Sequence, residues 1–567
     1  MGYMEKYKEW LKFDKETEKE LTGLSEKEIE ERFHKDLEFG TGGLRGIIGA
    51  GTNRMNVYTV RKATQGLANY INSKNIDCPC VAIAYDSRRY SDVFAKEAAL
   101  VLNANGIKTY VYRELMPTPM LSFAVRRLGA TAGIVVTASH NPKEYNGYKV
   151  YWSDGGQITE EHAKGILDEI NKVDYSEIKT MDFDKAALEE LYKYVQPIIE
   201  DEYFEAVKAQ AVNLEIIEKM GNKLNVIYTP LHGTGNKPVR RALKELGFEN
   251  VTVVPEQELP DSEFSTTKYP NPEEPEVFRI AIEMAKKNGA DLIIGTDPDC
   301  DRIGVVVKNK EGEYVVLTGN QTGVLLTHYI LDQLKNTGRM PKNPVIVKTI
   351  VTTELARRIC KDYGVEIIDV LTGFKYIGEK IKEFEETGNK SYIFGFEESY
   401  GYLAGTHARD KDGVVAAALI CEMAAYYKSK GMSLYDGMIE IYEKYGYYIE
   451  DLESLTMKGI EGSEKISNIM DKLRNNTPEN IADKNVVRVK DYLKRIDRNP
   501  CDGCKAEIDL PVSNVMQLFL EDGSLITARP SGTEPKIKFY FAAVGNSVDD
   551  AKETITKVKE EILRMVE

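Results

Sequence analysis

Cysteine and long apolar segments are scarce in this sequence. Seven cysteines in 567 residues are too few for a disulfide framework. Cys78 and Cys80 form one close pair and Cys501 and Cys504 another, but neither spacing is typical of a four-cysteine zinc site, which favours free thiols. The least charged stretch, residues 413–421, is far shorter than a membrane span. The first residues also lack the apolar core of a signal peptide, so we predict a cytoplasmic protein that binds no membrane.

Basic residues are also fewer than acidic ones. The chain has 75 Lys and Arg against 90 Asp and Glu, a net charge of −15. An acidic surface repels nucleic acid, so nucleic acid is not an expected partner. With 42% apolar and 29% charged residues the composition is that of an ordinary globular protein, and the length allows about four domains of ~150 residues. Both a monomer and a homodimer are compatible with these properties.

Short apolar runs alternate with amphipathic segments through most of the chain. Each run enters a loop rich in Gly, Pro or Asp; the runs are at residues 81–84, 134–137, 224–228, 292–294, 345–347 and 392–394. Repeated strand, loop and helix patterns predict α/β sheets with active loops at the carboxyl ends of the strands. The first ~37 residues instead read as helix. The C-terminal part reads as a hairpin at 515–528, a strand at 537–543 and a helix from 548, which predicts a separate α+β domain.

The apolar run at 134–137 leads directly into a serine and a histidine, Ser139 and His140, on a loop that Pro142 stiffens. No G-x-S-x-G turn surrounds this serine, and the chain has only six histidines, which argues against a serine hydrolase. We therefore expect Ser139 to act in a reaction other than hydrolysis by a serine hydrolase mechanism.

The run at 292–294 leads into a loop with Asp297, Asp299 and Asp301 at alternate positions. Alternate side chains of an extended segment point to one side, so these carboxylates repel one another unless a cation lies among them. Oxygen ligands without His or Cys favour Mg²⁺ or Ca²⁺. An EF-hand is excluded, because Arg302 and Lys308 stand where that motif needs Gly and Glu.

Two further loops carry groups suited to a sugar phosphate. Residues 529–536 combine an Arg, a Ser, a Thr and a Gly, which suits a phosphate dianion. Residues 395–401 combine adjacent carboxylates with a serine, which suits sugar hydroxyls. Neither a P-loop nor a kinase motif is present, so ATP is not the evident donor. Together these loops predict phosphoryl transfer through a phosphoserine to a substrate that already carries phosphate.

These motifs, in this order, resemble those of the α-D-phosphohexomutases. The matching stretches are FGTGGLRG (39–46), TASHNP (137–142), DPDCDR (297–302), EESYG (397–401) and RPSGTEPK (529–536). The stretch GLRGIIGAGTNRMN (43–56) is most similar to the bacterial phosphoglucomutase branch, which also resembles the phosphopentomutases. The resemblance extends over nearly the whole chain.

The resemblance implies a heart-shaped architecture of four domains around one cleft, with three related α/β domains and a C-terminal α+β domain. We expect residues 1–208 to contain the phosphoserine loop, 209–318 the metal loop, 319–440 the sugar loop and 441–567 the phosphate loop. The resemblance also implies that the protein is an isomerase that interconverts glucose 1-phosphate and glucose 6-phosphate. The phosphoserine gives its phosphoryl group to the sugar, glucose 1,6-bisphosphate forms, and the original phosphoryl group returns to the serine.

The resemblance also assigns roles to individual residues. Ser139 would carry the phosphoryl group, with Lys149, His140 and Arg45 beside it; Mg²⁺ would be held by Ser139, Asp297, Asp299 and Asp301. The residues expected to bind the substrate are Arg302, Thr372, Gly373, Glu397, Ser399, Lys411, Arg529, Ser531, Gly532 and Thr533. For Lys149 to accept a proton, its pKa should be lowered.

Alternatives remain open at this stage. A phosphopentomutase acting on ribose or deoxyribose 1-phosphate, a phosphomannomutase, and a transferase that uses an acyl phosphate on the same serine share this mechanism. A non-catalytic sugar-phosphate sensor is disfavoured because Ser139, the three aspartates and Arg529 are all present. Gly401 stands where some mannose-specific members carry a histidine, which favours glucose over mannose. Lys538 stands where many members carry an arginine.

Overall fold

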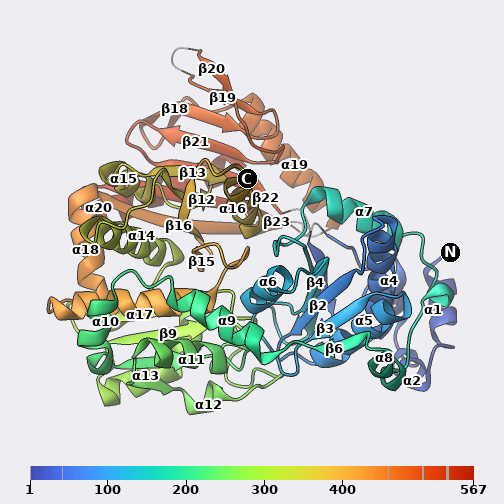
Figure 1. The fold of residues 1–567 in the computed structure, drawn as a ribbon. Coiled ribbons are helices and arrows are strands. Elements are labelled where there is room, and N and C mark those ends of the chain that lie inside the picture. Colours follow the sequence, from blue (N-terminus) through green and yellow to red (C-terminus); the bar gives the residue numbers. More distant parts are fainter. Residues whose placement is uncertain (1, 41, 458, 501–502, 532–535, 567) are drawn as a thin grey trace.

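The protein consists of four sheets with their helices, which we number as units one to four in chain order (Figure 1). The computed structural model describes residues 2–40, 42–457, 459–500, 503–531 and 536–566. Three units are α/β and the fourth combines an antiparallel sheet with two helices, which confirms the predicted fold class. In Figure 1 unit one (blue) lies opposite unit two (green), and unit four (orange to red) lies at the top.

Unit one begins with three short helices. The sequence predicted helix in this region but not that it is divided into three. Its sheet has the order β1-β5-β4-β2-β3-β6, in which β4, β2, β3 and β6 are parallel and β5 is antiparallel to both of its neighbours, β4 and β1. The strands are β1 (Gly43–Ile47), β2 (Cys80–Tyr85), β3 (Lys108–Val111), β4 (Ala132–Val136), β5 (Tyr145–Trp152) and β6 (Tyr192–Tyr194). The helices are α1 (Tyr3–Trp10), α2 (Lys15–Leu21), α3 (Glu26–Phe33), α4 (Val57–Ser73), α5 (Ser91–Ala104), α6 (Thr118–Arg127), α7 (Glu160–Ile170), α8 (Phe183–Leu188) and α9 (Pro197–Lys208).

Unit two has a five-stranded sheet in the order β11-β10-β9-β7-β8, in which β9, β7 and β8 are parallel. Its strands are β7 (Val226–Thr229), β8 (Val251–Val253), β9 (Leu292–Thr296), β10 (Ile303–Lys308) and β11 (Tyr314–Leu317). Its helices are α10 (Leu214–Met220), α11 (Asn236–Leu246), α12 (Pro255–Glu258) and α13 (Arg279–Asn288).

Unit three has a four-stranded sheet in the order β13-β12-β14-β15, and only β15 is antiparallel. Its strands are β12 (Pro344–Thr349), β13 (Glu366–Val370), β14 (Ser391–Glu397) and β15 (Gly401–Ala404). Its helices are α14 (Gly319–Asn336), α15 (Leu355–Tyr363), α16 (Phe374–Thr387), α17 (Gly413–Ser429) and α18 (Leu434–Tyr445).

Unit four is an antiparallel sheet in the order β16-β23-β22-β21-β18-β19-β20, with β17 at its side. Its strands are β16 (Tyr447–Thr456), β17 (Asn480–Ile481), β18 (Lys484–Asp491), β19 (Ile496–Arg498), β20 (Lys505–Glu507), β21 (Met516–Leu520), β22 (Leu525–Pro530) and β23 (Lys536–Gly545). Its helices are α19 (Gly459–Asn475) and α20 (Val548–Val566). The hairpin, last strand and last helix lie where the sequence predicted them.

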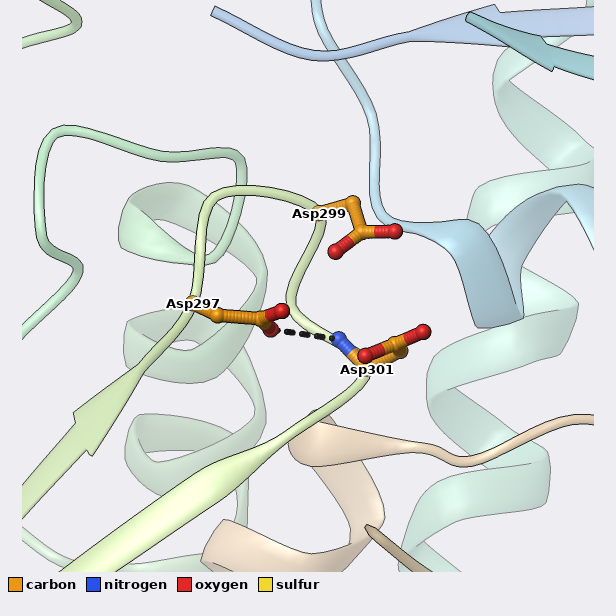
Figure 2. A group of neighbouring side chains, drawn as sticks. All are labelled: Asp297, Asp299 and Asp301. Atoms are coloured by element: carbon orange, nitrogen blue, oxygen red, sulfur yellow. Dashed lines mark hydrogen bonds between the residues drawn. The ribbon is translucent and has the colours of Figure 1, made fainter. Parts of the chain in front are cut away.

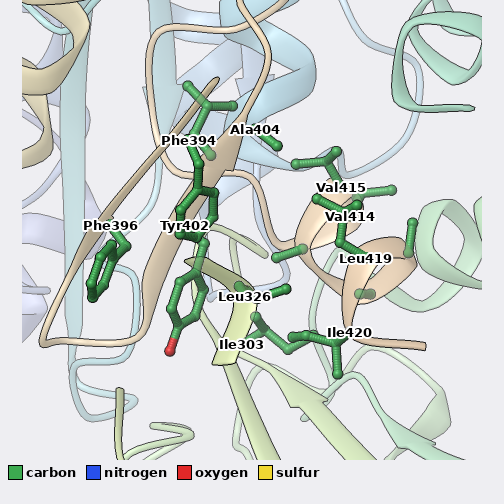
Figure 3. Close-up of a cluster of buried hydrophobic side chains, with 14 of the residues drawn as sticks. Ile303, Leu326, Phe394, Phe396, Tyr402, Ala404, Val414, Val415, Leu419 and Ile420 are labelled. Carbon is green, nitrogen blue, oxygen red and sulfur yellow. The ribbon is translucent and has the colours of Figure 1, made fainter. Parts of the chain in front are cut away.

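The weakly charged stretch at 413–421 is the start of α17, an apolar helix buried between units two and three. Figure 3 shows Val414, Val415, Leu419 and Ile420 of this helix packed near Ile303 and Leu326. A helix that is apolar on all sides is stable only when it is buried on all sides. The neighbours that bury α17 include α10, α11, β9 and β15. Among the described residues, no helix is both long and apolar enough to span a membrane.

The core that joins units two and three is expected to be sensitive to loss of volume. Leu326 is completely buried on α14, so Leu326→Ala should lower the free energy of unfolding by about 2–5 kcal/mol through lost burial and a cavity. Urea denaturation followed by circular dichroism measures this change. The matched control is Leu188→Ala, whose side chain is 85% exposed and whose loss should cost less than about 0.5 kcal/mol. Equal effects of the two substitutions would contradict this assignment of the core.

Candidate active site

The three aspartates lie on the turn that joins the antiparallel strands β9 and β10 (Figure 2). Asp297, Asp299 and Asp301 are buried, and one oxygen of each lies within 4.8 Å of the others. The sequence prediction that alternate positions bring these carboxylates together therefore agrees with their position in the fold. Cys300, in left-handed conformation with φ 53°, lets the turn close within six residues.

Hydrogen bonds occupy both oxygens of Asp297 but only Oδ2 of Asp299 and of Asp301. Asp297 accepts hydrogen bonds at Oδ1 from the backbone N–H groups of Asp301 (3.1 Å) and Arg302 (3.0 Å). Lys149 Nζ is 2.8 Å from Asp299 Oδ2 and 3.4 Å from Asp301 Oδ2. The Oδ1 atoms of Asp299 and Asp301 are buried and have no hydrogen-bond partner among the described residues. Buried carboxylate oxygens without partners are the donor set that a hard divalent cation takes, so these residues fit Mg²⁺.

Electrostatics affects the carboxyl groups of Asp297 and Asp301 in opposite directions. Burial, together with the charges of Asp299 and Asp301, raises the pKa of Asp297 well above its usual range. Burial also acts to raise the pKa of Asp301, but the ammonium groups of Lys411 and Lys149 outweigh it and lower that pKa below the usual range. Asp301 is therefore held ionised by lysines, whereas at Asp297 the charge of Arg302 does not offset burial and the two neighbouring carboxylates.

Ser139 lies directly against this cluster. It follows β4 in left-handed conformation, with φ 51°, and its hydroxyl donates to Asp297 Oδ2 over 2.7 Å. Its backbone N–H donates to Thr137 Oγ1 (2.8 Å). A positive φ at a residue other than glycine costs about 1–3 kcal/mol and here turns the hydroxyl from the strand end toward the metal loop.

Arg88 fixes the backbone of the Ser139 loop from behind. Its guanidinium donates to the carbonyl oxygens of Ser139 (2.5 Å), Asn141 (2.5 Å), Pro142 (2.8 Å) and Tyr145 (3.1 Å). The Arg88 side chain is fully buried beside the Asp86 carboxylate, 3.3 Å away. This contact of Arg88 with the Ser139 loop becomes visible only in the fold, because its four acceptors are backbone atoms that no sequence motif reveals.

His140 and Arg45 lie on the cleft side of Ser139. His140 Nδ1 is 3.1 Å from Ser139 Oγ, and burial together with the charges of Arg302 and Arg45 holds the pKa of His140 well below its usual range. The imidazole is therefore neutral at pH 7. Arg45, on β1, donates from Nη1 to Asn141 Oδ1 at 3.4 Å. Both residues thus lie at the serine loop, as the sequence analysis expected.

Lys149 and Lys411 approach the cluster from units one and three. Lys411 Nζ is 3.1 Å from Asp301 Oδ2 and 3.0 Å from Asp410 Oδ1. Burial acts to lower the pKa of Lys149, but the charges of Asp299 and Asp301 outweigh it and the pKa is raised. The protein charges alone therefore act against the expected lowering of this pKa, which counted on metal charge and stays a prediction. A divalent cation on the same carboxylates would weaken the cause of the shift.

The cluster lies beside a cleft of about 710 Å³ lined by all four units, whose lining includes His140 and Arg302, the chain neighbours of Ser139 and Asp301. His140 of unit one and Arg302 of unit two face Thr372, Gly373 and the sugar loop of unit three. The backbone of that loop is joined to the metal loop, since Ile303 N–H donates to the Tyr400 carbonyl over 3.1 Å. Glu397 and Ser399, both predicted to bind sugar hydroxyls, line the cleft.

Unit four contributes the opposite wall. Arg529 on β22 and Lys538 on β23 are register partners and line the cleft beside Tyr540. The loop between these strands is closed at its base by a hydrogen bond from Ser531 N–H to the Lys536 carbonyl (2.7 Å). The predicted phosphate ligands Gly532 and Thr533 lie outside the described residues.

Two features of the cleft become visible only in the fold. Glu273 forms an ion pair with Arg302 and lines the cleft, but its loop does not follow a recognisable strand, so no signal marked it. Gly401 gives space to the side chain of Lys411, whose aliphatic part lies where a Cβ atom of residue 401 would be.

Comparison with known proteins agrees with this geometry. Family models described as alpha/beta/alpha domains I, II and III of phosphoglucomutase/phosphomannomutase match residues 36–177, 201–312 and 318–445. The chain belongs to this family. A curated phosphoglucomutase of Staphylococcus haemolyticus is 39% identical over 515 residues, 90% of this chain and 91% of the relative. The predicted family and enzyme class are thereby confirmed.

Solved structures share the fold at lower identity. The open form of parafusin, a phosphoglucomutase from Paramecium, has a TM-score of 0.70 and 18% identity and covers 94% of each chain. A phosphoglucomutase/phosphomannomutase family protein from Burkholderia thailandensis has a TM-score of 0.66 and 19% identity, covering 93% of this chain and 96% of the other. The likeness extends over all four units.

Glu397 should make stability depend on pH. Burial raises the pKa of Glu397 from 4.5 to about 7, with Lys411 opposing and Glu398 adding to the shift. Between these values the folded chain keeps a proton that the unfolded chain releases, so stability falls as pH rises from about 4.5 to 7. Glu397→Gln should therefore raise the melting temperature relative to wild type more at pH 8 than at pH 5, measured by calorimetry. The exposed Glu311→Gln serves as the control; an unchanged difference between wild type and Glu397→Gln across pH would refute this prediction.

Proposed function

We propose that this chain interconverts glucose 1-phosphate and glucose 6-phosphate through a phosphoserine at Ser139. The observation that carries the proposal is the 2.7 Å contact between Ser139 Oγ and Asp297, beside a cleft to which all four units contribute. A serine that only stabilised the fold would not need burial against three carboxylates. The family and the name of the curated relative support the same reaction.

Asp297 Oδ2, Asp299 Oδ1 and Asp301 Oδ1 are the oxygens proposed to hold Mg²⁺, together with the phosphoserine. The bound cation supplies positive charge that stabilises the transferring phosphoryl group. Arg302 and the neutral His140 lie beside the same position and offer donors to the phosphoryl oxygens.

The transfer we propose breaks the bond between phosphorus and Ser139 Oγ and forms one from phosphorus to the free sugar hydroxyl. Lys149, in its uncharged form, is the candidate acceptor of the hydroxyl proton, and it passes that proton to the Ser139 oxygen that departs in the same transfer. In the return step the proton moves in the opposite direction, from the attacking Ser139 hydroxyl to the departing sugar oxygen. The resulting glucose 1,6-bisphosphate then turns round in the cleft, so the second phosphate faces Ser139.

The rest of the cleft serves binding in this proposal. Glu397 and Ser399 bind sugar hydroxyls, and Thr372, Gly373 and Lys411 bind the substrate on the unit-three side. Arg529, Ser531, Gly532 and Thr533 bind the phosphate that is not reacting. Arg and Lys groups on the unit-four wall, at Arg529 and Lys538, supply the positive charge that this phosphate requires.

The domain division at residues 1–208, 209–318, 319–440 and 441–567 is kept as a proposal with one adjustment. Each segment contains one of the four sheets, which supports it. Residue 440 falls inside α18, however, so we place the third boundary at Gly446, where φ is 102° and the helix ends. A monomer or homodimer in the cytoplasm stays a prediction.

Phosphorylation of Ser139 can be tested by intact-mass spectrometry of the purified protein. We expect a fraction ~80 Da heavier than the sequence mass, the mass of a phosphoryl group, and we expect Ser139→Ala to lack it. Ser429→Ala, at the exposed end of α17, should keep the heavier fraction. A heavier fraction that persists in Ser139→Ala would refute the assignment of the phosphoryl carrier.

Substrate choice can be tested by ³¹P NMR on an equal mixture of glucose 1-phosphate, mannose 1-phosphate and deoxyribose 1-phosphate, with Mg²⁺ and trace hexose bisphosphate. We expect glucose 1-phosphate to disappear fastest, and we expect EDTA to stop all three reactions until Mg²⁺ is added back. Faster loss of deoxyribose 1-phosphate would assign the chain to pentose phosphates by the same chemistry. If no resonance changes, the proposed reaction is wrong.

A further inference from the structure

Thr118 connects unit one to the metal loop of unit two. It is the first residue of α6 and is completely buried. Its backbone N–H donates to the carbonyl oxygen of Asp299 (3.0 Å), and its hydroxyl donates to Asp299 Oδ2 (2.9 Å). The first N–H groups of a helix lack partners within the helix, and here the metal loop supplies one.

These contacts determine which oxygen of Asp299 remains available. Oδ2 accepts from both Thr118 Oγ1 (2.9 Å) and Lys149 Nζ (2.8 Å), whereas Oδ1 is buried without a hydrogen-bond partner among the described residues. A carboxylate can exchange its two oxygens by rotating about the Cβ–Cγ bond. A hydroxyl fixed at the start of a packed helix opposes that rotation more than a flexible lysine does, because Lys149 also contacts Asp301 Oδ2 (3.4 Å) and can follow either carboxylate.

We propose that Thr118 is a positioning residue that orients Asp299 so that its Oδ1 atom faces the divalent cation. This inference rests on the proposed metal site. Partners that hydrogen-bond to a metal ligand fix its orientation, and their loss commonly weakens metal affinity by about 10–100-fold. Thr118 acts from a different unit than the loop it orients, so packing of unit one against unit two is coupled to the geometry of the site.

Thr118→Val tests the proposal because valine keeps the shape of threonine and the backbone N–H but lacks the hydroxyl. We expect the dissociation constant for Mn²⁺, measured by electron paramagnetic resonance of the free ion, to rise about tenfold. Turnover should be restored at high Mg²⁺, so that the half-saturating Mg²⁺ concentration rises while kcat changes little. Thr118→Ser, which keeps the hydroxyl, should bind Mn²⁺ like wild type.

Thr327→Val is the matched control. Thr327 is equally buried, but its hydroxyl donates to the carbonyl oxygen of Gly323 within α14 (2.8 Å). It should leave Mn²⁺ affinity unchanged while removing one buried hydrogen bond. Circular dichroism and the melting temperature of each variant establish that it is folded, and Thr118→Ala replaces Thr118→Val if the latter does not fold.

The outcomes separate this inference from the proposed function. If wild type and Thr118→Val bind Mn²⁺ equally, the positioning role is wrong and the metal site stands. The same conclusion follows if Thr118→Ser or Thr327→Val weakens binding as much as Thr118→Val does, because packing alone would then explain the loss. If wild-type protein binds no Mn²⁺, or if Asp299→Asn binds it as tightly as wild type, the proposed metal site fails and the inference fails with it.

Discussion

Mutual repulsion among three buried carboxylates is the constraint on which the arrangement of this protein depends. Asp297, Asp299 and Asp301 lie where water cannot screen them, so nearby cations must balance them. Lys149 reaches them from unit one and Lys411 from unit three, while Arg302 belongs to the metal loop itself. The same charges that make the site possible therefore join the three α/β units around it.

The positive charges around the three aspartates do not fully neutralise them. Arg302 also pairs with Glu273, and Lys411 also pairs with Asp410, so neither cation is devoted to the three aspartates alone. The raised pKa of Asp297 agrees with this remaining negative potential, as do the Oδ1 atoms of Asp299 and Asp301, which have no hydrogen-bond partner in the part of the chain that the structure describes. A divalent cation at this position would neutralise the excess negative charge and would take the Oδ1 atoms of Asp299 and Asp301 as ligands.

Sequence predicted well what depends on strand ends and poorly what depends on packing between units. Ser139, Asp297 and Glu397 follow apolar runs, so their presence at one edge of their sheets follows from the α/β pattern. Thr118 and Arg88 also act at this site, but they do so through a single hydroxyl and through backbone carbonyls. Nothing in the local pattern distinguishes such contacts from those of an ordinary buried threonine or arginine, because the partner is distant in sequence and becomes visible only in the fold.

Gly401 shows how an absent side chain can be informative once the fold is known. In the sequence, the glycine reads as the loss of a group that some family members place there. In the structure, the aliphatic chain of Lys411 occupies the space that a Cβ atom of residue 401 would need. A side chain at position 401 and Lys411 in its present place therefore exclude each other. Lys411 Nζ lies 3.1 Å from Asp301 Oδ2, so the space that a side chain at position 401 would need is taken by a residue whose charge acts on the metal loop.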